Sequence, residues 1–154
     1  MPHEESLYPA DWLRLAERDL GRVGRLLAEH DPELAGFCLQ QAMEKFLKAF
    51  LLCCGWQLRR IHALDTLLDD AITYDPSVEK YRSVCQKITG FYFVERYPLV
   101  VEAGLTEEDI RSSLEQVKGL IREIRGKVSG QRFERPDLLR IYQISQLVKV
   151  LLSS

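Results

Sequence analysis

The chain of 154 residues has the length of one domain, and its 46% of apolar residues can form a core without disulfide or metal staples. Its 21 basic and 23 acidic residues give a formal charge of −2, which excludes a general attraction to polyanions and leaves only a local patch for nucleic-acid contact. The start, Met-Pro-His-Glu-Glu, lacks the basic and apolar regions of a signal peptide, and no apolar run approaches the roughly 18 residues of a membrane span. We therefore expect a cytoplasmic protein without membrane contact.

The cysteines and histidines do not have the spacing of a metal site. They are Cys38, Cys53, Cys54 and Cys85, and His3, His30 and His62. The sequence has no Cys-x-x-Cys pair, and the histidines are widely separated. We expect reduced thiols, and neither a metal ion nor a cofactor.

The first two predicted helices form an antiparallel pair. The first runs from about Pro9 to Glu29, with apolar side chains at helical spacing at Trp12, Ala16, Leu20, Val23 and Leu27. Its charged back is typical of a solvated face. Gly21 and Gly24 lower helix propensity and would permit the close approach of a neighbouring helix. The connection at His30–Asp31 is short, which favours an antiparallel second helix.

The second helix is predicted from about Pro32 to Cys54, because Asp31 precedes it as an N-cap and Gly55 follows it as a C-cap. Its apolar stripe includes Leu39, Met43, Phe46 and Phe50. The polar side chains left on the other positions are Gln41, Glu44, Lys45 and Lys48. A Glu–Lys pair four residues apart also stabilises a helix surface by roughly 0.2–0.5 kcal/mol without any ligand, so this polar set has a purely structural interpretation as well.

Three further helices follow. They are predicted from His62 to near Tyr74, from Asp75–Pro76 to Glu95, and from Thr106 to Val128, the last with an acidic first turn that suits the positive end of the helix dipole. A histidine at the start of a helix, as at position 62, is typical of a cap or a hydrogen-bonded surface group.

Residues 91–101 form the most aromatic segment of the chain, and Pro98 ends the helix at Tyr97 or before. Exposed rings beside Arg96 would stack on bases, whereas rings at helical spacing also fill cores and dimer interfaces. Residues 99–103 are the one strand candidate, too short and isolated to build a sheet, so the sequence predicts an all-α fold.

The C-terminal segment differs from the rest. A polar stretch at 131–135 marks a boundary, and residues 138–152 are apolar on most of the circumference of a helix. We expect a helical bundle over residues 1–130 and a helical extension over residues 131–154 that packs on a neighbouring subunit or a partner.

Three motifs, in order and spacing, resemble the HEPN domain, the "higher eukaryotes and prokaryotes nucleotide-binding" family. They are Gln41-Ala42-x-Glu44-Lys45-x-x-Lys48-Ala49, His62-x-Leu64-x-x-Leu67-Leu68 and Arg96-Tyr97-Pro98. The likeness covers about Ala10 to Val128. It implies an up-and-down antiparallel bundle of about five helices that forms a homodimer, similar to the substrate-binding domain of kanamycin nucleotidyltransferase.

The resemblance also implies a function and a site. Members of the family commonly stand beside a minimal nucleotidyltransferase, in pairs that look like toxin–antitoxin modules. Carried over by position, the residues that would face a cleft and bind a nucleotide or RNA, or close the dimer, are Gln41, Glu44, Lys45, Lys48, His62 and Arg96.

The chain departs from the ribonucleases of this family, which place a histidine four to six residues after the arginine. Residues 97–103 contain no histidine, and His62 would be the substitute. We therefore expect a non-catalytic nucleotide- or nucleic-acid-binding subunit. The alternatives are a degenerate metal-independent ribonuclease toxin using Arg96 and His62, and a structural dimerisation adaptor.

Overall fold

The computed structural model describes residues 5–97, 104–130 and 138–152. Its elements are α1 (Pro9–Ala28), α2 (Pro32–Cys53), α3 (Leu64–Tyr74), a 3₁₀ segment η1 (Pro76–Tyr81), α4 (Arg82–Arg96), α5 (Glu107–Gly130) and α6 (Leu138–Leu152). No strand occurs among these residues, so the predicted all-α fold with an extra C-terminal helix is confirmed. The strand candidate at 99–103 lies outside the described residues.

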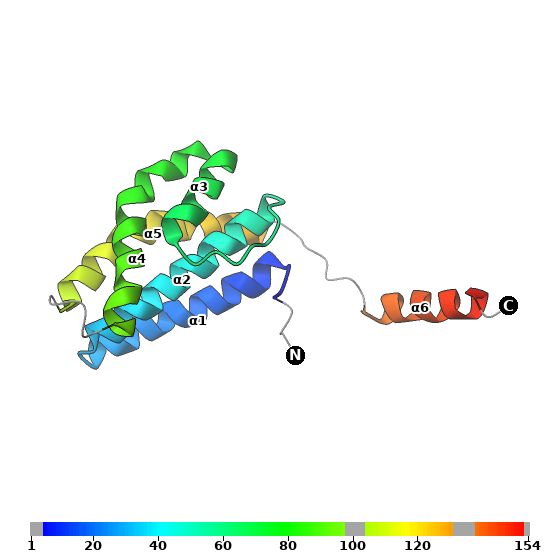
Figure 1. Cartoon of the computed structure of the whole chain (residues 1–154), viewed down its shortest axis with the longest axis horizontal. Helices are drawn as coiled ribbons and strands as arrows, with labels where there is room; N and C mark the ends of the chain where they lie inside the picture. The colour runs from blue at the N-terminus through cyan, green and yellow to red at the C-terminus, as the bar shows by residue number, and fades with distance from the viewer. Residues whose placement is uncertain (1–4, 98–103, 131–137, 153–154) are drawn as a thin grey trace.

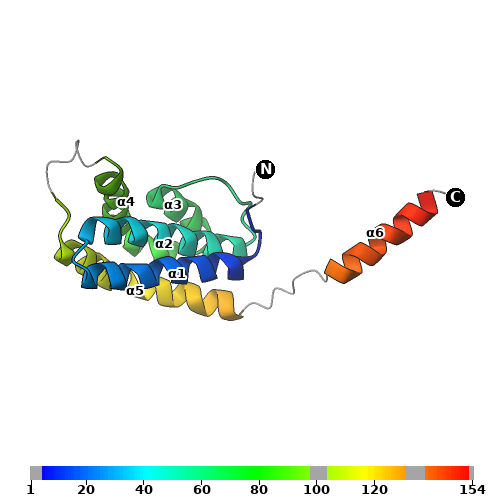
Figure 2. The same ribbon diagram turned by 90° about the horizontal axis from the view of Figure 1, so that it is seen from below.

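Helix α2 occupies the centre of the bundle. It packs against α1, α3, α4 and α5, and Figures 1 and 2 show α1 and α5 running beside it while α3 and α4 cover another side. Its apolar stripe is accordingly wide, and large side chains such as Leu39, Met43, Phe46 and Leu47 are fully buried. The bundle is therefore organised around the helix that carries the polar set.

The ends of α2 follow from the residues predicted to cap it. The Asp31 carboxylate accepts a hydrogen bond from the Leu34 N–H at 3.2 Å, and Pro32 opens the first turn. Gly55 follows the helix with φ +85°, a left-handed conformation that glycine adopts without steric cost. At the other end of α2, His30 precedes the Asp31 cap and adopts a φ of +57° in the tight turn that follows α1.

The segment after α3 differs in detail from the predicted single helix. The Asp75 carboxylate caps it by accepting the Ser77 N–H at 3.0 Å, as Asp-Pro predicts, but Pro76–Tyr81 winds as a 3₁₀ helix and the α-helix begins only at Arg82. Helix α4 then ends at Arg96, before Pro98, as expected.

The glycines that permit close approach are not those expected from the sequence. A Cβ on Gly21 or Gly24 would meet no atom within 4 Å among the described residues, so these glycines lie in open space. The close glycines are Gly119, whose Cβ would lie 2.5 Å from the Tyr81 hydroxyl, and Gly36, whose Cβ would lie 2.5 Å from Leu105 Cδ2, 3.0 Å from Ile110 Cδ1 and 3.1 Å from Phe91 Cβ. The chain therefore needs a small residue where α2 meets α4 and α5.

Helix α6 contacts no other described helix and lies apart from the bundle in both views. Within the described ranges, none of the helices combines the length and the apolar character required to cross a membrane.

Candidate functional site

The middle of α2 carries a row of polar side chains that point into the bundle. Gln40, Glu44 and Lys48 are buried at successive steps of four. Lys48 Nζ donates to Glu44 Oε1 at 2.9 Å, with the Lys48 side chain 1% exposed and the Glu44 side chain 7% exposed. The Lys48 ammonium also lies 5.0 Å from the centroid of the Trp12 ring. The i, i+4 pair read from the sequence is thus an interior ion pair.

His62 extends this buried pair to the surface. Its Nδ1 lies 3.1 Å from the same Glu44 oxygen, and the Gln40 amide donates to the His62 carbonyl at 3.0 Å. The imidazole is nevertheless 74% exposed, and Nε2 is the ring nitrogen left for an external partner. Glu44 Oε2 is buried and has no hydrogen-bond partner among the described residues.

A second ion pair joins α2 to α1. Lys45 Nζ contacts Asp19, whose carboxylate is 4% exposed and also accepts from Arg22 at 2.9 Å. The Lys45 side chain is 19% exposed. Next to it, Nε2 of Gln41 donates to the side-chain oxygen Oε1 of Gln40 at 2.7 Å. Three cations and two carboxylates therefore surround the middle of α2, with one positive charge in excess before His62 is counted.

Arg96 lies in a separate group of side chains at the C-terminal end of α4. Its guanidinium is 5.7 Å from the centroid of the Tyr92 ring. Tyr92 stacks on Phe37 of α2 at 5.6 Å, Tyr92 meets Phe93 at 5.6 Å, and Phe93 stacks on Tyr97 at 6.3 Å. We call Phe37, Tyr92, Phe93, Arg96 and Tyr97 the aromatic cluster. Phe93 and Tyr97 are each 50% exposed, so these two rings face solvent rather than the core.

The structure thus brings five of the six predicted residues together and leaves Arg96 apart. The Glu44 carboxylate links directly to Lys48 and His62, while Gln41 and Lys45 lie beside it on α2. In the described part of the chain, the contact recorded for Arg96 is with Tyr92, not with this group. Phe37 connects the two groups, because it lies one helical turn before Gln41 and stacks on Tyr92.

Sequence reasoning did not assign Asp19 or Gln40 to the site, and it predicted Trp12 only as an apolar residue of the first helix. Asp19 lies on the buried face of α1, at the step of the apolar stripe where the sequence analysis placed Leu20, and Leu20 is only partly buried. The available signal was spacing, since Trp12, Ala16, Asp19, Val23 and Leu27 also recur at steps of three and four. A polar residue in a well-spaced apolar stripe predicts a charge partner on the neighbouring helix, which here is Lys45.

The cysteines have the properties of structural thiols. None of the four forms a disulfide. Burial raises the pKa of the Cys85 thiol to about 12 and that of Cys53 to about 11, so both are held as neutral thiols at ordinary pH. Among the residues that the structure describes, no three histidine, cysteine or acidic side chains are grouped as metal ligands.

Comparison with known proteins gives the family. The sequence model of the HEPN domain matches residues 9–127, which is most of the bundle from α1 to the last turn of α5. The chain belongs to the HEPN family. The solved structure of TT1696 from Thermus thermophilus is similar to it, with a TM-score of 0.68 and 27% identity over 77% of this chain and 97% of that chain. No curated protein matches.

The HEPN match places the polar set and the aromatic cluster inside the family's domain, and leaves α6 outside it. The family supports a nucleotide- or RNA-related role for the helical bundle in general.

Proposed function

We propose that this HEPN protein is a non-catalytic subunit that binds a nucleotide or a nucleic acid, forms a homodimer and acts with a separate minimal nucleotidyltransferase in a toxin–antitoxin-like pair. The observation that carries the proposal is the aromatic cluster, in which an exposed arginine lies beside two half-exposed rings. Arginine binds phosphate through several donors, and aromatic faces stack on bases, so this combination suits both parts of a nucleotide.

The ion pairs indicate which predicted residues a ligand would reach. Lys48 is buried against Glu44, so its role in the proposal is to position Glu44 and, through it, His62. Lys45 is partly exposed, but its ammonium group already forms an ion pair with Asp19. Arg96 is exposed and forms no ion pair with another described residue. We therefore assign the main phosphate contact to Arg96, with Lys45 and Gln41 on the neighbouring face of α2 and His62 beside them in the segment before α3.

A direct test compares Arg96→Ala with Arg122→Ala. Both arginines are exposed helical residues, and each change removes one positive charge. Binding of ATP, GTP and a short single-stranded RNA would be measured by fluorescence anisotropy or calorimetry, with circular dichroism to verify folding. We expect Arg96→Ala to weaken binding at least about tenfold, or about 1.4 kcal/mol, and Arg122→Ala to leave it unchanged. Equal binding by both variants would place the site elsewhere.

The structural-adaptor alternative keeps one observation in its favour, namely that carboxylates already neutralise Lys45 and Lys48. It predicts that the parent protein binds none of the three probes. The partner is tested separately, by purifying the tagged protein from its native host at low and high salt and identifying what co-elutes. A stoichiometric small nucleotidyltransferase supports the pairing, and its absence at both salt concentrations counts against it.

A further inference from the structure

Helix α6 exposes an apolar surface that an isolated helix cannot keep in water. Its exposed side chains include Ile144, Leu147, Val148, Val150, Leu151 and Leu152. At 15 residues the helix is about 22 Å long, and isolated helices of this length are marginally stable. Since α6 contacts no other described helix of its chain, its surface requires cover from elsewhere.

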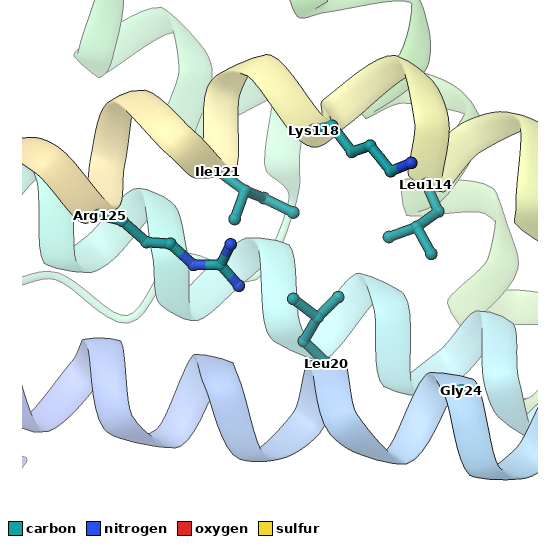
Figure 3. Close-up of a pocket in the computed structure, with 6 residues that line it drawn as sticks. All are labelled: Leu20, Gly24, Leu114, Lys118, Ile121 and Arg125. Atoms are coloured by element: carbon teal, nitrogen blue, oxygen red, sulfur yellow. The ribbon is translucent and has the colours of Figure 1, made fainter.

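The bundle carries an open apolar groove between α1 and α5, which lies outside the aromatic cluster. Leu20 and Gly24 of α1 and Leu114 and Ile121 of α5 line it, and Figure 3 shows these helices facing one another across it. Its volume is about 250 Å³, below the ~300–1,000 Å³ typical of small-molecule sites. Gly24 leaves the backbone of α1 open there. The groove therefore suits a few apolar side chains of a helix better than a metabolite.

The positive charges at the rim of the groove are paired, so they do not strongly repel a basic helix. Arg125 Nη2 donates to Glu17 at 2.8 Å, and Lys118 pairs with Glu115, so each rim cation already has a carboxylate partner. Residues 131–154 hold four basic and two acidic side chains, which leaves 17 basic and 21 acidic side chains in residues 1–130. The extension is thus positive by two and the bundle negative by four, so the two parts attract one another.

We propose that α6 of one copy docks in the α1–α5 groove of a second copy, and that the second copy returns its own α6 in the same way. The structure places α6 clear of the groove of its own chain, which leaves both surfaces open for exchange. In a two-fold exchange, each α6, which we call the arm, is covered and each groove is filled, and both contacts are of the same kind.

The area of such an exchange is that of a small protein–protein interface. Burying five leucine-like side chains removes roughly 60–120 Å² each from water. For two identical arms this comes to roughly 600–1,200 Å² of arm surface, which reaches the lower end of the range of specific protein–protein interfaces. The contact is distinct from the nucleotide site proposed above, and its test does not depend on that function.

The test uses cross-linking between two full-length variants that each carry one added cysteine. Leu147→Cys marks the arm and Lys118→Cys marks the rim of the groove, both in a Cys54→Ser background because Cys54 is the one native cysteine that is not fully buried. When the two variants are mixed and treated with a short bismaleimide, any 147–118 cross-link joins two copies. We expect this cross-linked peptide as the main product, identified by mass spectrometry.

A second test introduces Gly24→Glu into the Lys118→Cys copy, and Gly21→Glu in the same copy is its matched control. Both glycines lie in open space on α1, but only Gly24 lines the groove. We expect Gly24→Glu to reduce the cross-link at least about tenfold and Gly21→Glu to leave it unchanged. Equal effects of the two changes would overturn the proposal.

Two other occupants are distinguished by the same reagents. When Leu147→Cys and Lys118→Cys are in one chain, a 147–118 cross-link found only in a product of monomer mass on a denaturing gel assigns the groove to the chain's own α6 and overturns the exchange. Cross-linking of Leu147→Cys to another protein in the native-host purification, with none to Lys118→Cys, also overturns it and assigns α6 to that protein.

Discussion

Lys48 Nζ and Glu44 Oε1 lie 2.9 Å apart, with both side chains almost completely removed from solvent. Removing one partner of a buried ion pair typically costs about 3–5 kcal/mol, and loss of Lys48 would leave the Glu44 carboxylate with the imidazole of His62 as its remaining side-chain partner among the described residues. We therefore expect Lys48→Met to lower the free energy of unfolding by about that amount, as measured by urea denaturation. A loss of ligand binding in a Lys48 variant consequently has to be separated from a loss of fold.

The control for this prediction is Lys118→Met, which breaks an exposed pair with Glu115 and should cost less than about 1 kcal/mol. The double variant Glu44→Leu/Lys48→Met should recover most of the stability that Lys48→Met loses, because it removes both charges of the buried pair. Equal costs for Lys48→Met and Lys118→Met would show that the buried pair is not a determinant of stability.

Replacing Gly36 and Gly21 by alanine should change the free energy of unfolding in opposite directions. Alanine favours a helix over glycine by about 1 kcal/mol, so Gly21→Ala, in open space, should raise the free energy of unfolding by about 0.5–1 kcal/mol. At Gly36 the new methyl group would crowd Phe91 and Ile110, at a cost of about 1–3 kcal/mol that outweighs the helix propensity. Thermal or urea unfolding measures both, and stabilisation by Gly36→Ala would contradict the observed packing.

The start of α5 should contribute a pH-dependent stabilisation. Asp109 accepts from the Thr106 N–H at 3.0 Å and from its hydroxyl at 2.8 Å, and these hydrogen bonds hold the pKa of Asp109 below its usual value. A lowered folded-state pKa means that the ionised group stabilises the protein above its unfolded pKa, about 3.9, and that this contribution is lost as the pH falls through the folded-state value.

We expect Asp109→Asn to destabilise the protein at pH 7 by less than about 1 kcal/mol, because the carboxylate is partly exposed and screened. The difference from the parent should shrink as the pH falls below about 4. Glu108→Gln, in the same helical turn and exposed, is the control for the helix dipole alone. Urea denaturation at a series of pH values would contradict the prediction if both variants behaved alike.

The aromatic cluster should contribute to ligand binding without contributing much to stability. Phe93 and Tyr97 are half exposed, so replacing either by alanine removes little buried area. If each ring stacks on a base, its loss should weaken binding of single-stranded RNA by about 1–3 kcal/mol. Tyr74→Ala, at a similarly exposed ring on α3, is the control and should leave binding unchanged. Anisotropy titrations with the same oligonucleotide measure all three variants.

The helices of this protein could be predicted closely because each carries a regular apolar stripe and clear end signals. Asp31, Pro32 and Gly55 fix the ends of α2, and Pro98 follows the end of α4, in positions where backbone geometry leaves few alternatives. The 3₁₀ winding at Pro76–Tyr81 was not predicted, since a proline permits either kind of helix after it.

The candidate site was less predictable because its geometry depends on contacts between helices. The sequence showed Glu44 and Lys48 four residues apart, but the pair is an interior one because other helices pack on α2, with Trp12 of α1 beside Lys48. The burial of Asp19 likewise depends on Lys45 of another helix. Arg96 lies apart from this group because of the position at which α4 crosses α2. The order of motifs along the sequence does not predict that position.

The central position of α2 also determines how the molecule opens. Since α1, α3, α4 and α5 all pack on α2, an outer helix can separate from the bundle while the remaining three still cover most of it. The amide protons of α2 should therefore exchange with solvent only when the whole bundle unfolds, whereas those of α3, which is short, can exchange through a local opening. The exchange rates of α2 would then report the global stability of the protein in the absence of any denaturant.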